Sequence, residues 1–475
     1  MNLENTEDER AASHASHAHA LSEVVRMALP MIVAMASSTM MHFVDSWMVS
    51  RVGTAEIAAV VPAGAWVFIL ISFLIGVLSC TSTFVGQSYG AGEYRDCARY
   101  AWQGVYVSVV MGGLATLLWP VAPAIFAAVG HGAQVQEREV VYFQIRLFSI
   151  TGLTMSVALG SFFQAVSRPR IPMVIVVVAN LMNAGLDYVL IFGKLGFEPT
   201  GIRGAAIATV IASSLQGLTM LLVFLSPPFN RRFGSLGTAR WDWRRMGRLF
   251  SIGWAAGLNF ALDVASWSVF TNFLVGRLGK IPLAASNIAV QITHLSFMPT
   301  VGLSMAITAL VGQWIGRKEV GAAERRTYIA LGLAMAYMFA MGVVFVVFRR
   351  QLISFFRSEP EVVALGSRIL IVAAVFQVFD AIGIVTSGAL KGAGDTRWVA
   401  MFTVTYAWLV FLPTSYLMAF RLKLGAVGAW TGVALYIFFL SMTLLWRFRG
   451  KRWRRIDIFG AENLIRSVEP ELLGH

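Results

Sequence analysis

Residues 57–80 read IAAVVPAGAWVFILISFLIGVLSC, a run without a single charged side chain, and the motif Val-Gly-Gln follows at 85–87 with Gly90 one turn later. A helix that crosses the hydrocarbon core of a bilayer needs about 20 mostly apolar residues. A second apolar run, 283–315, contains the same motif at 311–313, with Gly316 after it, at an offset of 226 residues. These stretches predict membrane-spanning helices that belong to a duplicated unit.

The rest of the chain has the composition of a polytopic membrane protein. Of its 475 residues, 57% are hydrophobic and 13% are charged, whereas soluble domains have about 45–50% apolar and about 25% charged residues. An all-α membrane protein with twelve transmembrane helices is therefore expected. The apolar stretches are 25–48, 56–80, 99–126, 140–166, 171–193, 203–226, 247–276, 283–315, 325–347, 362–390, 397–420 and 425–447.

An arginine-rich interruption at 227–246 divides these stretches into two groups of six. The offset of 226 also aligns the start of the second stretch with that of the eighth, because Arg51, Gly53, Ala58 and Ala59 match Arg277, Gly279, Ala284 and Ala285. We therefore expect two pseudo-symmetric six-helix lobes, with the substrate site at their interface. The predicted organisation is a disordered tail (1–20), an N-lobe (21–226), a basic linker (227–246), a C-lobe (247–447) and a basic tail (448–475).

The formal net charge of +13 is better explained by membrane topology than by nucleic acid binding. With both termini on one side, the segments on that side carry roughly twice as many Lys and Arg residues as the opposite loops. Such an excess marks the cytoplasmic side. We expect a multi-pass protein of the plasma (inner) membrane with both termini cytoplasmic, whose partners are the lipid bilayer and no nucleic acid. The basic C-terminal tail suits contact with anionic headgroups.

Four carboxylates fall inside the predicted helices, at Asp45, Asp187, Asp263 and Asp380. A charged side chain at the centre of a bilayer costs about 3 kcal/mol even on a lenient scale, so intramembrane acids usually serve a function. A buried carboxyl group can also bind and release protons at cellular pH. The alternative is structural, since a buried Asp can simply hydrogen-bond to a neighbouring helix.

Polar residues accompany these acids in each half. In the N-lobe, Asn183 and Asn180 lie four and seven residues before Asp187, on the same helical face. Asp45 and Thr209 are expected to complete a set of oxygen ligands for a proton or a small hard cation such as Na⁺. In the C-lobe, Asn259 lies one turn before Asp263. Near Asp380 lie Gln377 and Phe376.

Enzyme and ATPase motifs are missing from the sequence. It contains no GxxxxGK[ST], HExxH or GxSxG motif. We therefore expect no enzymatic activity and no cofactor apart from a coupling ion, H⁺ or Na⁺.

Several longer motifs are similar to those of the multidrug and toxic compound extrusion (MATE) transporters. They are LPMIVAMASSTMMHFVDSWMVSRVG at 29–53, FVGQSYGAGE at 84–93, NAGLDYVLIFG at 183–193, GIRGAAIATVIA at 201–212 and VFDAIGIVTSGALKGAGDTR at 378–397. The resemblance covers about residues 21–450. It implies a V-shaped cavity between two lobes, alternating access, and export of small organic cations or amphipathic drugs in exchange for H⁺ or Na⁺. A monomer is the default expectation.

The resemblance also assigns roles to residues. It implies that Asp45, Asn183, Asp187 and Thr209 form the N-lobe coupling site, and that Asp263 and Asp380 form the C-lobe acidic pair of the NorM-like branch. That branch usually has Glu where this chain has Asp263, and often Tyr where it has Phe376. The DinF-like branch usually lacks the C-lobe acids. This chain has both sets, so the coupling ion stays open.

Two other functions are alternatives. A flippase for a lipid-linked oligosaccharide, from the same superfamily, would need basic residues in the cavity to bind a pyrophosphate, and Arg146 and Arg368 are the candidates. A membrane receptor or enzyme would need a large extramembrane domain or a catalytic constellation, and the sequence shows neither.

Overall fold

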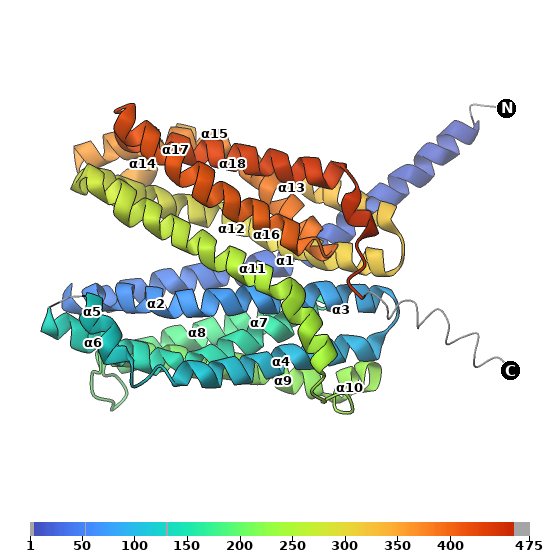
Figure 1. Cartoon of the computed structure of the whole chain (residues 1–475), viewed down its shortest axis with the longest axis horizontal. Helices are drawn as coiled ribbons and strands as arrows, with labels where there is room; N and C mark the ends of the chain where they lie inside the picture. Colours follow the sequence, from blue (N-terminus) through green and yellow to red (C-terminus); the bar gives the residue numbers. More distant parts are fainter. Residues whose placement is uncertain (1–3, 53, 130–131, 460–475) are drawn as a thin grey trace.

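The computed structural model describes residues 4–52, 54–129 and 132–459, which fold into helices and turns without a strand in these ranges. The helices form two lobes that lie one above the other in Figure 1. The N-lobe helices are α1 (Glu4–Ser50), α2 (Thr54–Ser79), α3 (Thr81–Gly90), α4 (Tyr94–Thr116), α5 (Ala122–Val129), α6 (Ala133–Leu147), α7 (Ser149–Ala165), α8 (Arg170–Phe192) and α9 (Ile202–Leu225).

The C-lobe repeats this arrangement after the short helix α10 (Pro227–Phe233). Its helices are α11 (Trp243–Ser268) with its extensions η1 (Val269–Val275) and η2 (Gly276–Leu278), α12 (Lys280–Gly316), α13 (Val320–Val347), α14 (Arg349–Ser354), α15 (Pro360–Gly392), α16 (Thr396–Tyr406), η3 (Ala407–Phe411), α17 (Leu412–Tyr416), η4 (Leu417–Arg421), α18 (Gly425–Arg449) and η5 (Arg452–Arg455). The predicted all-helical, two-lobed fold is confirmed.

Ten helical segments of the described chain are each long and apolar enough to cross a membrane. The pair α6 and α7, bent by 43°, provides an eleventh span. The remaining predicted span corresponds to α4, whose 23 residues are long enough to cross. The first turns of α4 contain the charged residues Arg95, Asp96 and Arg99, and these residues lower the mean hydropathy of the helix.

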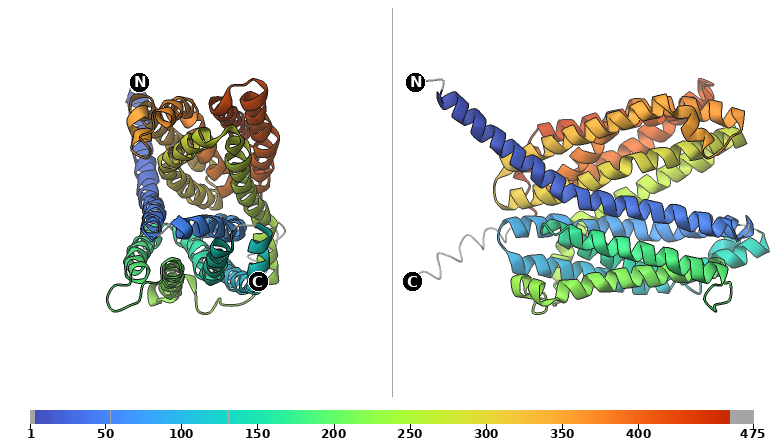
Figure 2. Two further views of the ribbon diagram at one scale, coloured as in Figure 1. Left: turned by 90° about the vertical axis from the view of Figure 1, so that its left-hand side faces the viewer. Right: turned by 180° about the vertical axis from the view of Figure 1, so that it is seen from behind.

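Two helices connect the lobes. The first half of α1 packs against the C-lobe core through Val24, Met27 and Met31, whereas Val49 near its end packs on the N-lobe. Figure 2 shows α1 running from one lobe to the other. Helix α11 does the reverse, because its beginning packs against N-lobe helices and η1 packs inside the C-lobe. The lobe boundary therefore crosses these helices and does not coincide with the predicted limits of 21–226 and 247–447.

Three local predictions differ from the structure. Where a tail is predicted, the structure describes residues 4–20 as the start of α1; this segment is rich in Ala and carries acidic residues near its start, which favour a helix N-terminus. The predicted span 99–126 is broken between α4 and α5, where Pro120 and Pro123 disfavour a continuous helix. The linker 227–246 contains α10 and the first residues of α11.

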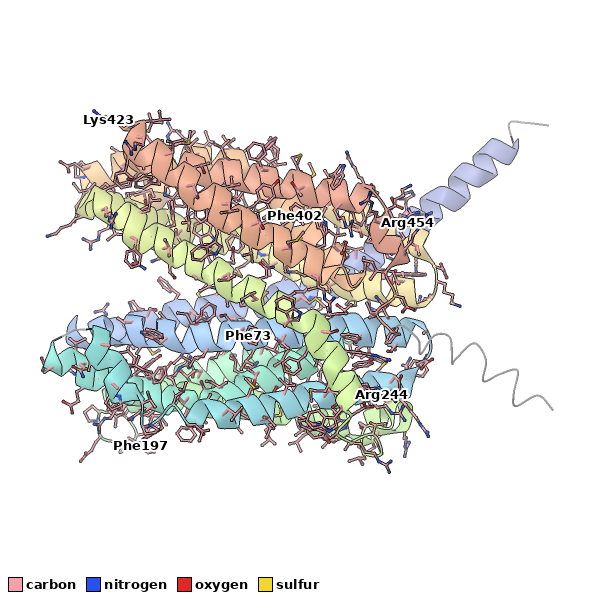
Figure 3. The ribbon with its side chains drawn as sticks, viewed as in Figure 1. Phe73, Phe197, Arg244, Phe402, Lys423 and Arg454 are labelled. Atoms are coloured by element: carbon pink, nitrogen blue, oxygen red, sulfur yellow. The ribbon has the colours of Figure 1, made fainter. Side chains whose placement is uncertain are left out.

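The lobes converge at the end of the molecule where α1 begins and α18 ends (Figure 1). Arg244 and Arg454 lie at this end, and Phe197 and Lys423 lie at the opposite end (Figure 3). A segment that we call the C-terminal strap, residues 452–459, spans both lobes here. Its Trp453 packs in the C-lobe core, and its Ile458 and Phe459 pack in the N-lobe core.

Candidate functional site

The N-lobe acids meet around a single amide. Asn183 of α8 donates through Nδ2 to Asp45 Oδ1 of α1 and to Asp187 Oδ2, both at 3.2 Å. Asp45 and Asp187 are also within hydrogen-bonding range of each other. Two negative charges this close repel strongly, so the pair is disposed to share a proton or a cation.

Two oxygens of this cluster are buried without a hydrogen-bond partner, namely Asn183 Oδ1 and Asp187 Oδ1. Asn183 is 4% exposed and Asp187 is 1% exposed. An unpaired buried acceptor costs about 1–3 kcal/mol. Oxygen atoms of this kind suit a proton or a hard cation, so the residues present fit the predicted ligand chemistry.

Two further groups, the guanidinium of Arg146 and the imidazole of His42, lie near the N-lobe cluster. Arg146 of α6 interacts electrostatically with Asp45 and Asp187, and its buried Nε has no hydrogen-bond partner. Its guanidinium carbon lies 6.0 Å from the ring centroid of Tyr142. His42, one turn before Asp45, interacts electrostatically with Asp45 and Arg146. The N-lobe site thus contains a fixed positive charge.

The other two predicted N-lobe residues bind elsewhere. Asn180 Nδ2 donates to Ser37 Oγ of α1 at 2.9 Å, which ties α8 to α1 on the same face as Asn183. Thr209 of α9 donates to the carbonyl of Ala205 at 2.9 Å. Its hydroxyl makes no recorded hydrogen bond to the acids.

The C-lobe acids come from different helices, Asp263 from α11 and Asp380 from α15. The two carboxylates interact electrostatically. Both side chains are half-buried, and neither has a recorded hydrogen bond among the described residues. This pair is therefore more loosely held than the N-lobe cluster.

Two amide oxygens lie one turn before these acids, buried and without a hydrogen-bond partner. They are Asn259 Oδ1 and Gln377 Oε1. The Nε2 of Gln377 donates to Ser296 Oγ at 2.7 Å. Phe376 is 4% exposed and stacks on Trp430 in the C-lobe core, with ring centroids 6.5 Å apart. The structure thus places Phe376 in the C-lobe core, one helical turn before Asp380.

Sequence reasoning missed three neighbours of the acids. Besides Tyr142, these are Lys391 near the end of α15, which interacts electrostatically with Asp263, and Tyr436 of α18, which interacts with both C-lobe acids. Arg146 was considered only as a pyrophosphate ligand and not as a partner of the N-lobe acids. For Lys391 the available signal was a basic residue at the end of an apolar run. Arg368, in contrast, is exposed on α15.

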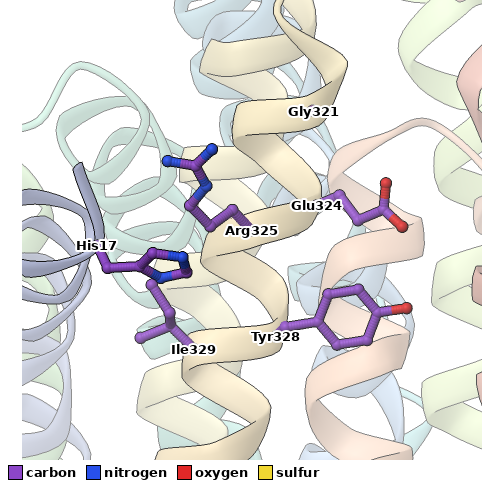
Figure 4. A pocket seen from close by; sticks show the side chains of 6 residues that line it. All are labelled: His17, Gly321, Glu324, Arg325, Tyr328 and Ile329. Atoms are coloured by element: carbon purple, nitrogen blue, oxygen red, sulfur yellow. The ribbon is translucent and has the colours of Figure 1, made fainter. Parts of the chain in front are cut away.

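Two surface pockets lie outside both acidic clusters. One, of about 450 Å³, is lined by His17, Gly321, Glu324, Arg325, Tyr328 and Ile329, between α1 and the first turns of α13 (Figure 4). The other, of about 190 Å³, lies between α1, α12 and α13 and is mostly apolar. Neither contains a carboxylate of the two clusters.

Comparison with known proteins gives consistent matches. The MatE family model matches residues 30–189 and again 259–417, once in each half. A probable multidrug resistance protein NorM of Bradyrhizobium diazoefficiens is 30% identical over 433 residues, which are 90% of this chain and 92% of the relative. The multidrug resistance protein NorM of Burkholderia vietnamiensis is 29% identical over 436 residues, covering 90% and 94%.

Solved structures resemble the whole fold. An outward-facing multidrug resistance MATE family transporter superimposes with a TM-score of 0.85 at 20% identity, covering 92% of this chain and 97% of that chain. A MOP superfamily transporter from Pyrococcus furiosus gives a TM-score of 0.83 at 21% identity, with the same coverage.

Proposed function

The chain belongs to the MatE (MATE) family, and from this premise we propose that it is a cation-coupled antiporter that exports organic cations and amphipathic toxic compounds. Members of this family are multi-pass membrane transporters and not enzymes. The relatives named for multidrug resistance support small-molecule substrates for this chain. One chain with two complete lobes supports a monomer as the transporting unit.

The observation that carries the proposal is the N-lobe cluster. Asn183 holds Asp45 and Asp187 together, and two buried oxygens remain without a donor. A proton or Na⁺ at this point would relieve both the repulsion and the unpaired acceptors. The C-lobe pair, Asp263 and Asp380, provides negative charge for a cationic drug or a second ion.

Coupling requires that the two ligands prefer different states of the protein. Cation uptake from outside would favour the state that has released drug, and drug would favour the state without the cation.

If both termini lie in the cytoplasm, as predicted, the end of the molecule where the lobes converge would face the cytoplasm. This structure would then represent a state closed on the cytoplasmic side.

No contact in the structure favours a flippase of lipid-linked oligosaccharides. Binding the pyrophosphate of such a lipid would need arginines in the interior whose charge is not already neutralised by nearby carboxylates. Arg146 lies among the N-lobe carboxylates, and Arg368 is exposed. We therefore keep drug–cation exchange as the single proposal.

The test is transport of a fluorescent organic cation, measured as efflux from proteoliposomes or as uptake into everted vesicles, with Na⁺ and pH gradients imposed separately. The gradient that drives efflux identifies the coupling ion. Asp187→Asn and Asp380→Asn should each reduce gradient-driven efflux, whereas Glu359→Gln, an exposed acid paired with Arg357, should not. Efflux that persists unchanged in both Asp variants would refute the assignment.

A further inference from the structure

Two buried glutamines, one in each lobe, occupy equivalent positions of the sequence repeat. Gln87 of α3 is 5% exposed, and Gln313 near the end of α12 is 1% exposed. Gln87 Nε2 donates to the carbonyl of Gly392 at 3.2 Å, and Gln313 Nε2 donates to the carbonyl of Ala165 at 2.7 Å. Each amide thus reaches from its own lobe into the other.

The two acceptors are equivalent as well. Ala165 is the last residue of α7, and Gly392 is the last residue of α15. The final four carbonyls of a helix have no partner within that helix. Each glutamine therefore satisfies a helix-end carbonyl that would otherwise need water.

The backbones around the glutamines approach each other closely and in a reciprocal way. A Cβ atom on Gly90 would overlap the carbonyl of Gln313, and one on Gly316 would overlap the carbonyl of Gln87. This contact admits no side chain at either glycine. The two amides are accordingly shielded from water while the lobes are together.

Other hydrogen bonds between the lobes lie at the same end. Thr83 Oγ1 donates to the carbonyl of Lys391 at 2.9 Å, and Gln313 Nε2 also donates to Ser167 Oγ at 2.9 Å. In the described part of the chain, no recorded hydrogen bond joins α2–α9 to α12–α18 at the opposite end. Among the described residues, such bonds therefore fasten only the end of the molecule at which α1 begins and α18 ends.

We propose that Gln87 and Gln313 form a two-part latch that holds the cytoplasmic side closed and that must open when the interior is exposed to the cytoplasm. The inference rests on the proposed alternating-access function. In the open state the amides and the helix-end carbonyls are hydrated, so the latch stabilises only the closed state. Both halves contribute to the latch: Gln87 donates one hydrogen bond between the lobes, and Gln313 donates to both Ala165 and Ser167.

The test measures the distance between spin labels across the cytoplasmic end. Labels are placed at Arg231→Cys and Gly321→Cys, both exposed sites, in a protein whose buried Cys80 and Cys97 are replaced by Ala. Gln87→Leu should raise the ratio of long to short distances about five-fold, the change expected for one net hydrogen bond, and Gln313→Leu, which removes two donated bonds, should raise it about five-fold or more. The double variant should raise the ratio further than either single variant.

The matched control is Gln216→Leu, which removes an amide that donates to Ser156 within the N-lobe, and it should leave the ratio unchanged. If a Leu variant does not fold, Gln87→Asn and Gln313→Asn keep the polarity but cannot reach the carbonyl, and should shift the ratio in the same direction. A ratio that stays at the control value in either glutamine variant, or a shift in only one of them, overturns the latch.

Drug efflux by the same preparations separates this inference from the proposed function. Absence of gradient-driven efflux in the unsubstituted protein would refute the antiporter and leave the distance result valid. An unshifted distance ratio with intact efflux would refute only the latch.

Discussion

The side-chain amide of Asn183 donates hydrogen bonds to both carboxylates of the N-lobe cluster and so holds them close together. Replacing it in Asn183→Leu keeps the volume but removes the donor shared by Asp45 and Asp187. A hydrogen bond to a charged group contributes about 1.5–3 kcal/mol, so we expect gradient-driven efflux to fall about ten-fold or more. Initial rates of dye efflux from proteoliposomes measure this.

Asn180 offers the matched comparison because it lies on the same face of α8 but donates to Ser37. Asn180→Leu should therefore leave coupled efflux within about three-fold of the unsubstituted protein, as expected for loss of a bond between neutral groups. Equal rates in the two Leu variants would contradict the role of Asn183.

At the scale of residues, the sequence predicted that four carboxylates lie inside helices and that Asn183 and Asp187 share one helical face, because side chains four residues apart are adjacent on a helix. It did not predict that Phe376 packs in the core against Trp430. Helix α15 packs against α12, α13 and α18, and its rotation depends on these three contacts together. No local sequence pattern contains that information. The charge that Arg146 adds to the N-lobe cluster also depends on packing between helices.

Helix α11 begins at a capping carboxylate that lies outside the apolar run. Asp242 accepts hydrogen bonds from the backbone N–H groups of Arg244 and Arg245 and pairs with the Arg245 side chain. Desolvation opposes its charge, but the hydrogen bonds from Arg245 and Arg244 outweigh this and lower the pKa of Asp242. The cap thus stabilises the start of a helix that connects both lobes.

Asp242→Ala should reduce stability by about 1 kcal/mol at pH 7, the usual contribution of an N-cap. Because the folded-state pKa is lowered, this contribution is complete above the unfolded pKa of about 4 and is lost as the pH falls through the lower, folded value. Thermal unfolding in detergent between pH 7 and pH 3 measures it. A stability difference from the unsubstituted protein that does not shrink in acid would contradict the cap.

The C-terminal strap packs on both lobes, and this packing should limit the motion of its backbone. The rings of Trp453 and Phe448 stack with their centroids 5.2 Å apart. The ring centroid of Phe459 lies 6.2 Å from that of Phe84 and 6.2 Å from that of Tyr100. Ile458 is 8% exposed. Burial of a large apolar side chain contributes about 1.5–3 kcal/mol.

The double variant Ile458→Ser and Phe459→Ser should therefore speed tryptic cleavage after Arg454 and Arg455 about ten-fold or more, because the strap detaches more often. The assay uses everted vesicles, in which the proposed cytoplasmic face is accessible. Leu236→Ser, at an exposed position of the linker, is the control. Cleavage of the double variant at the control rate would show that the strap is not held by these side chains.

Closure of the whole molecule depends on two glycines where the lobes meet. The Cβ atom of Gly316→Ala would overlap the carbonyl of Gln87, so the cytoplasmic side could not close and efflux should fall about ten-fold or more. Gly332→Ala, in α13, has no atom within 4 Å of its Cβ and should transport at the unsubstituted rate. Normal efflux by Gly316→Ala would contradict the closed state described above.

The two-lobe architecture was predictable from the apolar runs and the repeat offset of 226 residues, because both are properties of the chain itself. The bonds that join the lobes were not. Gln87 and Gly392 are 305 positions apart, and their contact depends on how two complete lobes dock. The crossing of α1 and α11 between the lobes was missed for the same reason.

The central claim is that one molecule exchanges drug for a cation. The most direct measurement starts from proteoliposomes without an ion gradient, imposes a gradient of an organic cation alone, and records internal pH and Na⁺ together. The account predicts that the drug gradient moves H⁺ or Na⁺ in the opposite direction and that Asp187→Asn abolishes this counter-movement. Drug that equilibrates through the unsubstituted protein without any movement of either ion would contradict it.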